Sequence, residues 1–219
     1  MPAPPLLAFD HVAVACRTLA EGIAHVRTAL GIYMPPGGAH PLMGTHNRLA
    51  SLGPTEFLEV IAVDPDALPP ERPRWFGLDG FDHTPRLGTW MLATPDIEAS
   101  MEDLARRLRN AGLDDVDLGR AIPITRGNLT WRMAIPDDGS VPLDGAFPTL
   151  IEWPGDHPAS RMGAVGCHLE GLTVEHPEGE RISSVLAPVF ADPRVKVRAG
   201  PAKAIGMEIA TPDGTRTLV

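Results

Sequence analysis

The alternation of apolar and polar positions first predicts a strand near the amino-terminal end of the chain. Residues 9–15 read FDHVAVA, in which two valines alternate with His11 and two alanines. Because successive side chains of a strand point to opposite faces, the valines would share one face and His11 would share the other with the alanines. The pattern therefore indicates a strand with one face for core packing and one face of small residues that carries an imidazole.

A helix and two more strands follow this first strand. Thr18 and Glu21 have the spacing of a capping box, and the apolar residues after them recur at helical intervals up to Gly31. Residues 46–52 and 56–63 then read as two strands around a Gly-Pro turn. The preceding PPGG segment is expected to form a turn.

The same order of elements recurs along the chain. A second round is expected as a strand at residues 87–93, a helix that opens at 94–96 and ends at Gly112, and strands at 128–135 and 146–153. A third, shorter round is expected as a strand at 168–175, a helix at 182–190 and strands at 195–199 and 203–210. We therefore predict an α+β fold of repeated βαβββ modules, with mixed sheets curled into a cupped half-barrel, helices on the outside and a third partial repeat.

The domain boundaries follow from this periodicity. They are expected at 1–66 for the first module, 67–85 for a linker loop, 86–158 for the second module and 165–219 for the third, a βαββ unit. The linker is rich in proline, glycine and charge, which is typical of surface loops.

Composition and charge narrow the function class. The chain has 219 residues, of which 43% are hydrophobic, and its net charge is −9. With no cluster of lysine or arginine, this charge argues against a nucleic-acid ligand and favours a small molecule. No apolar stretch is long enough to cross a bilayer and no signal segment is visible, so we expect a cytoplasmic protein without a membrane partner. Cys16 and Cys167 lack a partner motif and are expected to be free thiols.

Two acids interrupt otherwise apolar strands. Glu59 lies between Leu58 and Val60 in one strand, and Glu152 occupies a similar place in another. A carboxylate on such a face is costly to desolvate unless it is paired, bound to a metal or open to a cavity. If the repeats form one cup, His11, Glu59, Thr89 and Glu152 would face the same cavity. Such a set suits Zn, Mn, Fe, Co or Ni.

Other residues have two interpretations each. Salt bridges to Arg48 or Arg132 are the alternative for the two acids. Trp131 could line a ligand cavity or fill the core, and Arg132 could receive a substrate carboxylate or lie at the surface. His46 is a candidate substrate contact or substitute ligand, with a loop-organising hydrogen bond as its alternative. Thr89 is either a substrate contact or a packing residue.

These motifs resemble a known superfamily. Paired βαβββ repeats with DHV in the first strand and LEV or IEW in the last resemble the vicinal oxygen chelate superfamily, which includes glyoxalase I, extradiol dioxygenases and fosfomycin-resistance proteins. More narrowly, PPGGAHPLMGTHNRLASLG followed by EFLEVIAVDP resembles the glyoxalase-like domain proteins. The likeness extends over nearly the whole chain.

The resemblance implies both a ligand set and a reaction. It implies His11 and Glu59 from the first module and Glu152 from the second as metal ligands, with Glu152 as ligand or base, while Thr89 stands where a stronger ligand is common. A divalent ion would then support isomerase or lyase chemistry on a substrate with two adjacent oxygens. The alternative is a binding module without metal or catalysis. A homodimer is a further option, because the third repeat could support one.

Overall fold

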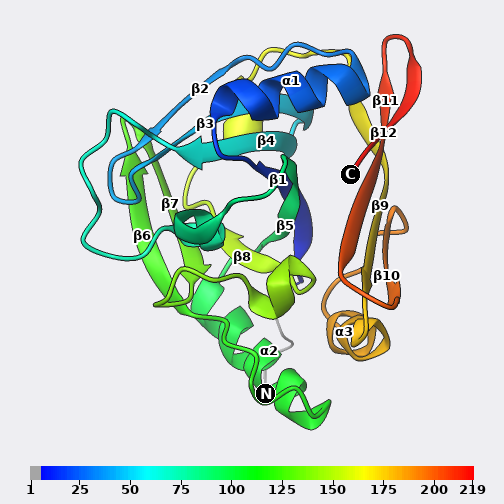
Figure 1. Cartoon of the computed structure of the whole chain (residues 1–219). Helices are drawn as coiled ribbons and strands as arrows, with labels where there is room; N and C mark the ends of the chain where they lie inside the picture. The colour runs from blue at the N-terminus through cyan, green and yellow to red at the C-terminus, as the bar shows by residue number, and fades with distance from the viewer. Residues whose placement is uncertain (1–5) are drawn as a thin grey trace.

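The computed structural model describes residues 6–219, so the first five residues of the expected first module lie outside the described part. The chain forms an eight-stranded sheet in the order β2-β3-β4-β1-β5-β8-β7-β6 and a four-stranded sheet in the order β10-β9-β11-β12. Figure 1 shows the smaller sheet standing beside the larger one. This architecture confirms the predicted α+β class with mixed sheets, a cupped half-barrel and a further repeat.

The first module contains one helix and four strands. Its elements are β1 (Ala8–Ala15), α1 (Leu19–Leu30), β2 (Pro36–His40), β3 (Thr45–Gly53) and β4 (Glu56–Val63). The Thr18 hydroxyl accepts a hydrogen bond from the Glu21 amide, and Gly31 ends the helix at a φ of 72°, a left-handed conformation that favours glycine. Strand β2 was not predicted, since its PPGG start reads as a turn.

The second module repeats this plan with short 3-10 turns between its elements. It contains η1 (Trp75–Gly80), β5 (Arg86–Ala93), α2 (Ile97–Asn110), β6 (Arg120–Arg126), β7 (Leu129–Ile135), η2 (Pro142–Gly145), β8 (Thr149–Glu152) and η3 (Pro158–Arg161). Strand β6 was not predicted either, so each module has one strand more than the predicted ranges.

The third unit has one strand more than the predicted βαββ order. It contains β9 (His168–His176), α3 (Gly179–Leu186), β10 (Val195–Ala199), β11 (Ala204–Thr211) and β12 (Gly214–Leu218). The helix begins earlier than predicted. None of the helices described between residues 6 and 219 has the length and apolar character needed to cross a membrane.

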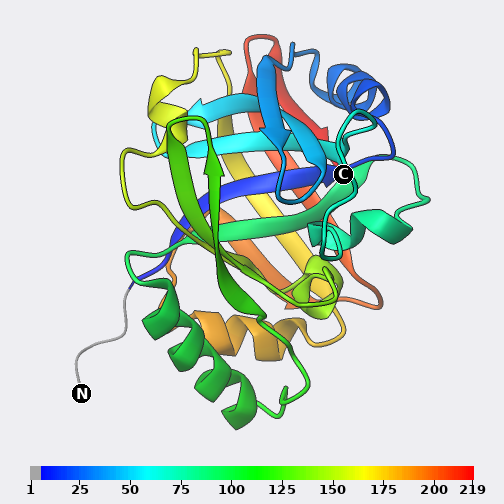
Figure 2. The ribbon, with the colours of Figure 1, turned by 90° about the vertical axis from the view of Figure 1, so that its left-hand side faces the viewer.

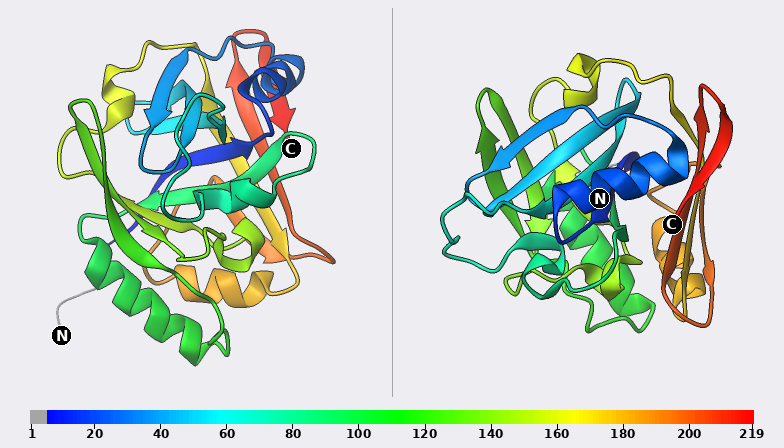
Figure 3. Two further views of the ribbon diagram at one scale, coloured as in Figure 1. Left: turned by 60° about the vertical axis from the view of Figure 1, so that its left-hand side comes forward. Right: turned by 45° about the horizontal axis from the view of Figure 1, so that its top comes forward.

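The two modules join along β1 and β5. Strand β1 pairs with β4 in parallel and with β5 antiparallel, which places Ala13 opposite Glu59 on one side and Thr89 on the other. The sheet then curls until β2 and β6, its two edges, contact each other. Figure 2 looks onto the concave side, with β1 and β5 across the back and the β6–β7 hairpin in front. The views in Figure 3 show the same curl from two further directions.

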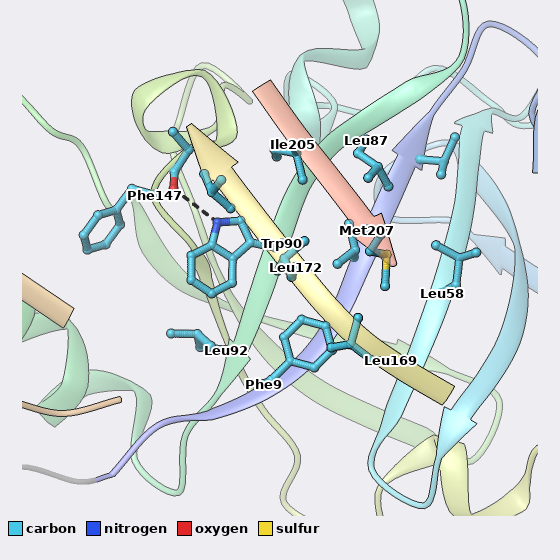
Figure 4. Packing of buried hydrophobic residues seen from close by; sticks show 14 of the residues in the cluster. Phe9, Leu58, Leu87, Trp90, Leu92, Phe147, Leu169, Leu172, Ile205 and Met207 are labelled. Atoms are coloured by element: carbon cyan, nitrogen blue, oxygen red, sulfur yellow. Dashed lines mark hydrogen bonds between the residues drawn. The ribbon is translucent and has the colours of Figure 1, made fainter. Parts of the chain in front are cut away.

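The convex side of the large sheet is closed by the small sheet. Alternate residues of β1 and β5, such as Val12 and Trp90, are fully buried there with Leu172 and Met207 of the small sheet. Figure 4 shows this layer, in which the Trp90 indole donates to the carbonyl of Ala146 at 3.1 Å. Each large apolar side chain buried in it contributes roughly 2 kcal/mol to folding. The convex face therefore packs into the core and stabilises the fold, whereas the concave face is available to form a site.

Candidate functional site

A pocket occupies the concave face of the large sheet. It contains about 390 Å³ of space not filled by protein atoms, its open mouth included. Most of its wall is apolar or aromatic, and its aromatic side chains include Phe57, Trp75, Trp131 and Trp153. Polar groups enter this wall at only a few points, which is the usual composition of a small-molecule site.

His11 lies in the pocket wall and is fixed from behind by Asp10. The pairing of β1 with β5 is irregular between Phe9 and His11, and this irregularity lets Asp10 turn toward its neighbour. Asp10 Oδ1 lies 2.5 Å from Nδ1 of His11. Its other oxygen accepts from Trp153 Nε1 at 2.8 Å and from His157 Nε2 at 3.0 Å. Asp10 is therefore buried with every oxygen satisfied, and His11 presents Nε2 to the pocket.

Glu59 lies beside His11 in the pocket wall, on the neighbouring strand β4. Its Oε2 lies 3.7 Å from Nε2 of His11, and its Oε1 accepts a hydrogen bond from the Asn47 amide at 2.7 Å. The Phe57 ring stacks on the imidazole, with the ring centroids 4.1 Å apart. The two polar groups thus meet on an apolar floor, with Nε2 and Oε2 too far apart for a strong hydrogen bond.

Charge pairing sets the protonation of this group. Burial by itself lowers the pKa of His11, but the hydrogen bond with Asp10 and the nearby negative charge of Glu59 outweigh it and raise that pKa to about 9. Burial also disfavours the ionised form of both acids, yet the interaction with His11 lowers the pKa of Asp10 and of Glu59 below their usual values. At neutral pH the group therefore consists of an imidazolium between two carboxylates.

A second polar cluster lies beside Glu59. Asn47 Oδ1 accepts from the Gly38 amide at 2.8 Å and from Arg126 Nη1 at 3.2 Å. Arg126 Nη1 also lies 3.1 Å from Nε2 of His40, whose Nδ1 is 3.0 Å from the Thr45 hydroxyl. Burial lowers the pKa of His40 to about 4, so this imidazole is neutral at pH 7 and accepts from the guanidinium.

Sequence reasoning missed Asp10, Asn47 and Arg126, and it assigned His40 a loop-organising hydrogen bond in preference to catalysis. One local signal was available for Arg126, because Gly127 and the asparagine after it form a two-residue link between strand-like ITR and LTW segments. That signal predicts the β6–β7 hairpin and places Arg126 near its tip. The pattern around Asp10 contains no comparable signal, since its orientation depends on the irregular pairing with β5.

The structure brings together three of the predicted site residues. His11, Glu59 and Trp131 all line the pocket. Thr89 lies on the same face of the sheet but is fully buried outside the pocket wall, and its hydroxyl has no hydrogen-bond partner among the described residues. His46 is partly exposed outside the pocket, with Nδ1 3.8 Å from the Asp64 carboxylate.

Glu152 and Arg132 do not join this group, which corrects the expected convergence. Glu152 Oε2 accepts from the Ile97 amide at 2.8 Å, at the start of α2, and lies 3.6 Å from Nη1 of Arg132. Arg132 also pairs with Glu98 on α2. The salt bridge weighed as the alternative for Glu152 is therefore present, and Arg132 does not face the pocket.

Strand register explains why Glu152 lies elsewhere. In the first module, Ala13 of β1 pairs with Glu59 of β4. In the second module, Met91 occupies the place of Ala13 and pairs with Thr149 of β8. Thr149 is thus the counterpart of Glu59, and Glu152 lies three positions further along the chain. Aligning LIEW (residues 150–153) with FLEV (residues 57–60) matches Glu152 to Glu59 and so does not show this offset of three positions.

The side chains present do not complete a site for a resident divalent ion. Within residues 6–219 no three or more His, Cys, Asp or Glu side chains are grouped so that they could hold one metal. His11 Nε2 and Glu59 are two strong donors, whereas the corresponding places in the second module hold Thr89 and Thr149. His40 is no substitute, because its Nε2 faces the Arg126 cation. Protein metal sites usually offer three or more strong donors, so the side chains of this pocket do not fit a resident divalent ion.

Comparison with solved structures finds several proteins of similar structure. A hypothetical protein from Staphylococcus aureus is similar over 90% of this chain and 88% of its own, with a TM-score of 0.57 and 15% identity. A methylmalonyl-CoA epimerase variant from Streptomyces coelicolor, in complex with 2-nitronate-propionyl-CoA, matches over 68% of this chain and 99% of its own, with a TM-score of 0.43 and 16% identity. The Mycobacterium tuberculosis methylmalonyl-CoA epimerase matches over 73% and 95%, with a TM-score of 0.43 and 20% identity.

Sequence comparison identifies the family. No curated protein matches the chain. The model of the glyoxalase-like domain matches residues 9–190. This range includes the pocket and nearly all of the large sheet, and it extends through β9 and α3 of the third unit. The chain therefore belongs to the glyoxalase-like domain family.

Proposed function

We propose that the pocket is the active site of an enzyme that moves a proton on a small carbonyl compound, in isomerase or lyase chemistry of the glyoxalase-like type. The observation that supports this best is the facing pair of His11 Nε2 and Glu59 Oε2, 3.7 Å apart in an apolar pocket. A proton donor and a proton acceptor that point to the same small volume are the minimum equipment for general acid and base catalysis.

The roles of the two groups follow from their protonation. His11 carries a proton on Nε2 and can donate a hydrogen bond to a substrate carbonyl oxygen. Glu59 is ionised and can remove a proton from the carbon next to that carbonyl. The developing enolate oxygen then lies against the imidazolium, which stabilises its charge in a site with little water. Glu59 finally returns the proton to the same or a neighbouring carbon, or the enolate expels a leaving group.

Asp10 and Asn47 would keep the two groups in position. Asp10 accepts a hydrogen bond from the Nδ1–H group of His11 and so leaves Nε2 as the donor to the substrate. Asn47 donates to one oxygen of Glu59 and leaves the oxygen nearer His11 free to act as base. A substrate with a second oxygen beside the carbonyl is favoured, because that oxygen makes the intervening or adjacent C–H bond more acidic.

Non-catalytic binding of a small molecule is the second candidate. It is favoured by the aromatic wall of the pocket and by the threonines that replace strong polar groups in the second module. A binding module would hold a ligand whether or not Glu59 can accept a proton. The two candidates therefore differ in what the loss of that carboxylate does.

Hydrogen–deuterium exchange tests the proposal directly. The protein is incubated in D2O with 2-hydroxyacetophenone or phenylpyruvamide, and loss of the C–H signal next to the carbonyl is followed by NMR. We expect the wild type to accelerate exchange and Glu59→Gln to lower the rate by about 100-fold or more, while calorimetry shows the probe still bound. Glu102→Gln, an exposed change on α2, is the matched control. If both probes bind without any acceleration of exchange, the proposed enzymatic function is contradicted and the binding module is favoured.

A further inference from the structure

We infer that the substrate is an apolar carboxylic acid whose carboxylate is bound by Arg126. This inference rests on the proposed function, because it takes the Arg126 side of the pocket and the His11–Glu59 side to hold one molecule. Arg126 ends β6 at the hairpin tip, and its side chain lines the same pocket as Glu59. It comes from the second module, so the two modules would supply the two ends of the substrate site.

The surroundings of Arg126 do not neutralise its charge through a direct ion pair. Its Nη1 donates to His40 Nε2 and Asn47 Oδ1, both of which belong to neutral groups. No carboxylate of the described residues forms an ion pair with it. Arg194, which is also only partly exposed, has two acid partners, Glu56 and Asp192. In a chain with 28 acidic and 19 basic residues, a half-buried arginine without such a partner is a candidate receptor for an external anion.

The guanidinium is also held in a way that leaves a binding edge open. Nη1 donates hydrogen bonds to Asn47 and His40, and the centre of the guanidinium lies 5.9 Å from the centroid of the Trp131 ring. Within the described part of the chain, Nε and Nη2 make no hydrogen bond. Gly38 lies directly beside the side chain, where an added Cβ would be 2.9 Å from Cδ and 3.2 Å from both Nε and Nη1, so the absence of a side chain at this position lets the guanidinium take this place. Two parallel N–H groups of a fixed guanidinium match the two oxygens of a carboxylate.

The position of Asn47 limits the size of the substrate. Its Nδ2 donates to Glu59 at 2.7 Å, while its Oδ1 accepts from Arg126 at 3.2 Å. One amide group therefore separates the proposed base from the proposed anion receptor. A substrate that reaches both has its carboxylate only a few bonds from the carbon that loses a proton, as in a 2-oxo or 2-hydroxy acid. Its remaining part would contact Trp131, Trp153 and Phe57, which favours an aromatic or branched apolar group.

Phenylpyruvate and phenylpyruvamide form a matched pair of probes for this inference, since they differ in the charge of one group. Calorimetry is expected to show that the wild type binds phenylpyruvate about tenfold or more tightly than phenylpyruvamide. Arg126→Gln should weaken the binding of phenylpyruvate by a similar factor and leave the binding of phenylpyruvamide unchanged. Arg126→Lys should cause an intermediate loss of affinity for phenylpyruvate. Arg120→Gln, on the same strand but exposed and paired with Asp137, should change neither.

The outcomes separate this inference from the proposed function. Unchanged binding of phenylpyruvamide by Arg126→Gln shows that the pocket is intact, so a loss limited to phenylpyruvate reports the missing charge. Equal affinity of the wild type for the two probes, or tight binding of phenylpyruvate by Arg126→Gln, would overturn the carboxylate inference even if proton exchange occurs. Arg126-dependent binding with no exchange of either probe would leave the carboxylate site standing and overturn the enzyme.

Discussion

Asp10 lies with one carboxylate oxygen 2.5 Å from Nδ1 of His11, and this contact determines which imidazole nitrogen faces the pocket. Replacing the carboxylate in Asp10→Asn removes a negative charge next to the imidazolium. We expect the pKa of His11 to fall from about 9 and the exchange rate to drop by about 100-fold. NMR titration of the His11 ring signals measures the first effect and the deuterium assay the second. An unchanged His11 pKa in this variant would contradict the role of Asp10.

The raised pKa of His11 also predicts a dependence of stability on pH. In the unfolded chain the imidazole has its ordinary pKa of 6.5, whereas in the folded chain it lies at about 9. Its contribution is therefore fully present below pH 6.5 and is lost as the pH rises through 9. The loss is at most about 3 kcal/mol. Urea unfolding from pH 6 to 10 should show this decline in the wild type.

Two variants isolate the origin of this decline. His11→Gln removes the titrating group and should flatten the change above pH 6.5, although it lowers stability overall because Asp10 and Glu59 lose their cation. His83→Gln changes an exposed histidine near Asp82 and Phe81 and should keep the wild-type slope. If the free energy of unfolding of His11→Gln still declined above pH 6.5, another titrating group would be the cause of the decline.

Glu152 is predicted to stabilise α2 and to take no part in the pocket. Its carboxylate accepts from the Ile97 amide at the positive end of the helix. Glu152→Gln keeps an acceptor but removes the charge, so we expect a loss of about 1 kcal/mol in the free energy of unfolding. Exchange and probe affinity should stay at wild-type levels. A selective loss of either would return Glu152 to the site.

Metal content gives a further prediction. Since the pocket offers two strong protein donors, adding Zn, Mn, Fe, Co or Ni should not raise the melting temperature, and chelation should not reduce exchange. Elemental analysis of the purified wild type, His11→Ala and Glu59→Ala is the direct measurement. About one ion per wild-type chain, lost in both variants, would contradict this and restore the metal expected from the family resemblance.

Gly38 provides a test of Arg126 that leaves its charge unchanged. A Cβ at this position would lie 2.9 Å from Cδ of Arg126, so Gly38→Ala should displace the guanidinium. We expect several-fold weaker binding of phenylpyruvate and unchanged binding of phenylpyruvamide. Gly53→Ala is the matched control, because the nearest atom to its added Cβ is 4.0 Å away. Equal effects of the two changes would show that the geometry around Arg126 does not matter.

The parts of the site that rest on local periodicity could be predicted from the amino-acid sequence alone. Glu59 lies between Leu58 and Val60, and His11 precedes the alternating VAVA segment, so a period of two assigns both to the face opposite the core. Buried valines and leucines make that assignment robust, since a slip by one residue would expose them. The helix caps at Thr18 and Gly31 are equally local and were also predicted.

The tertiary structure decided the other half of the site. Register between β5 and β8 placed Thr149 where Glu152 was expected, and no local pattern encodes that offset. Strand β2 is short of apolar residues and lies against residues far along the chain, as in the contact of Gly38 with Arg126. The orientation of Asp10 depends on irregular pairing with a strand of the other module. Periodicity can assign a residue to a face, whereas pairing between distant strands decides which faces and which residues meet.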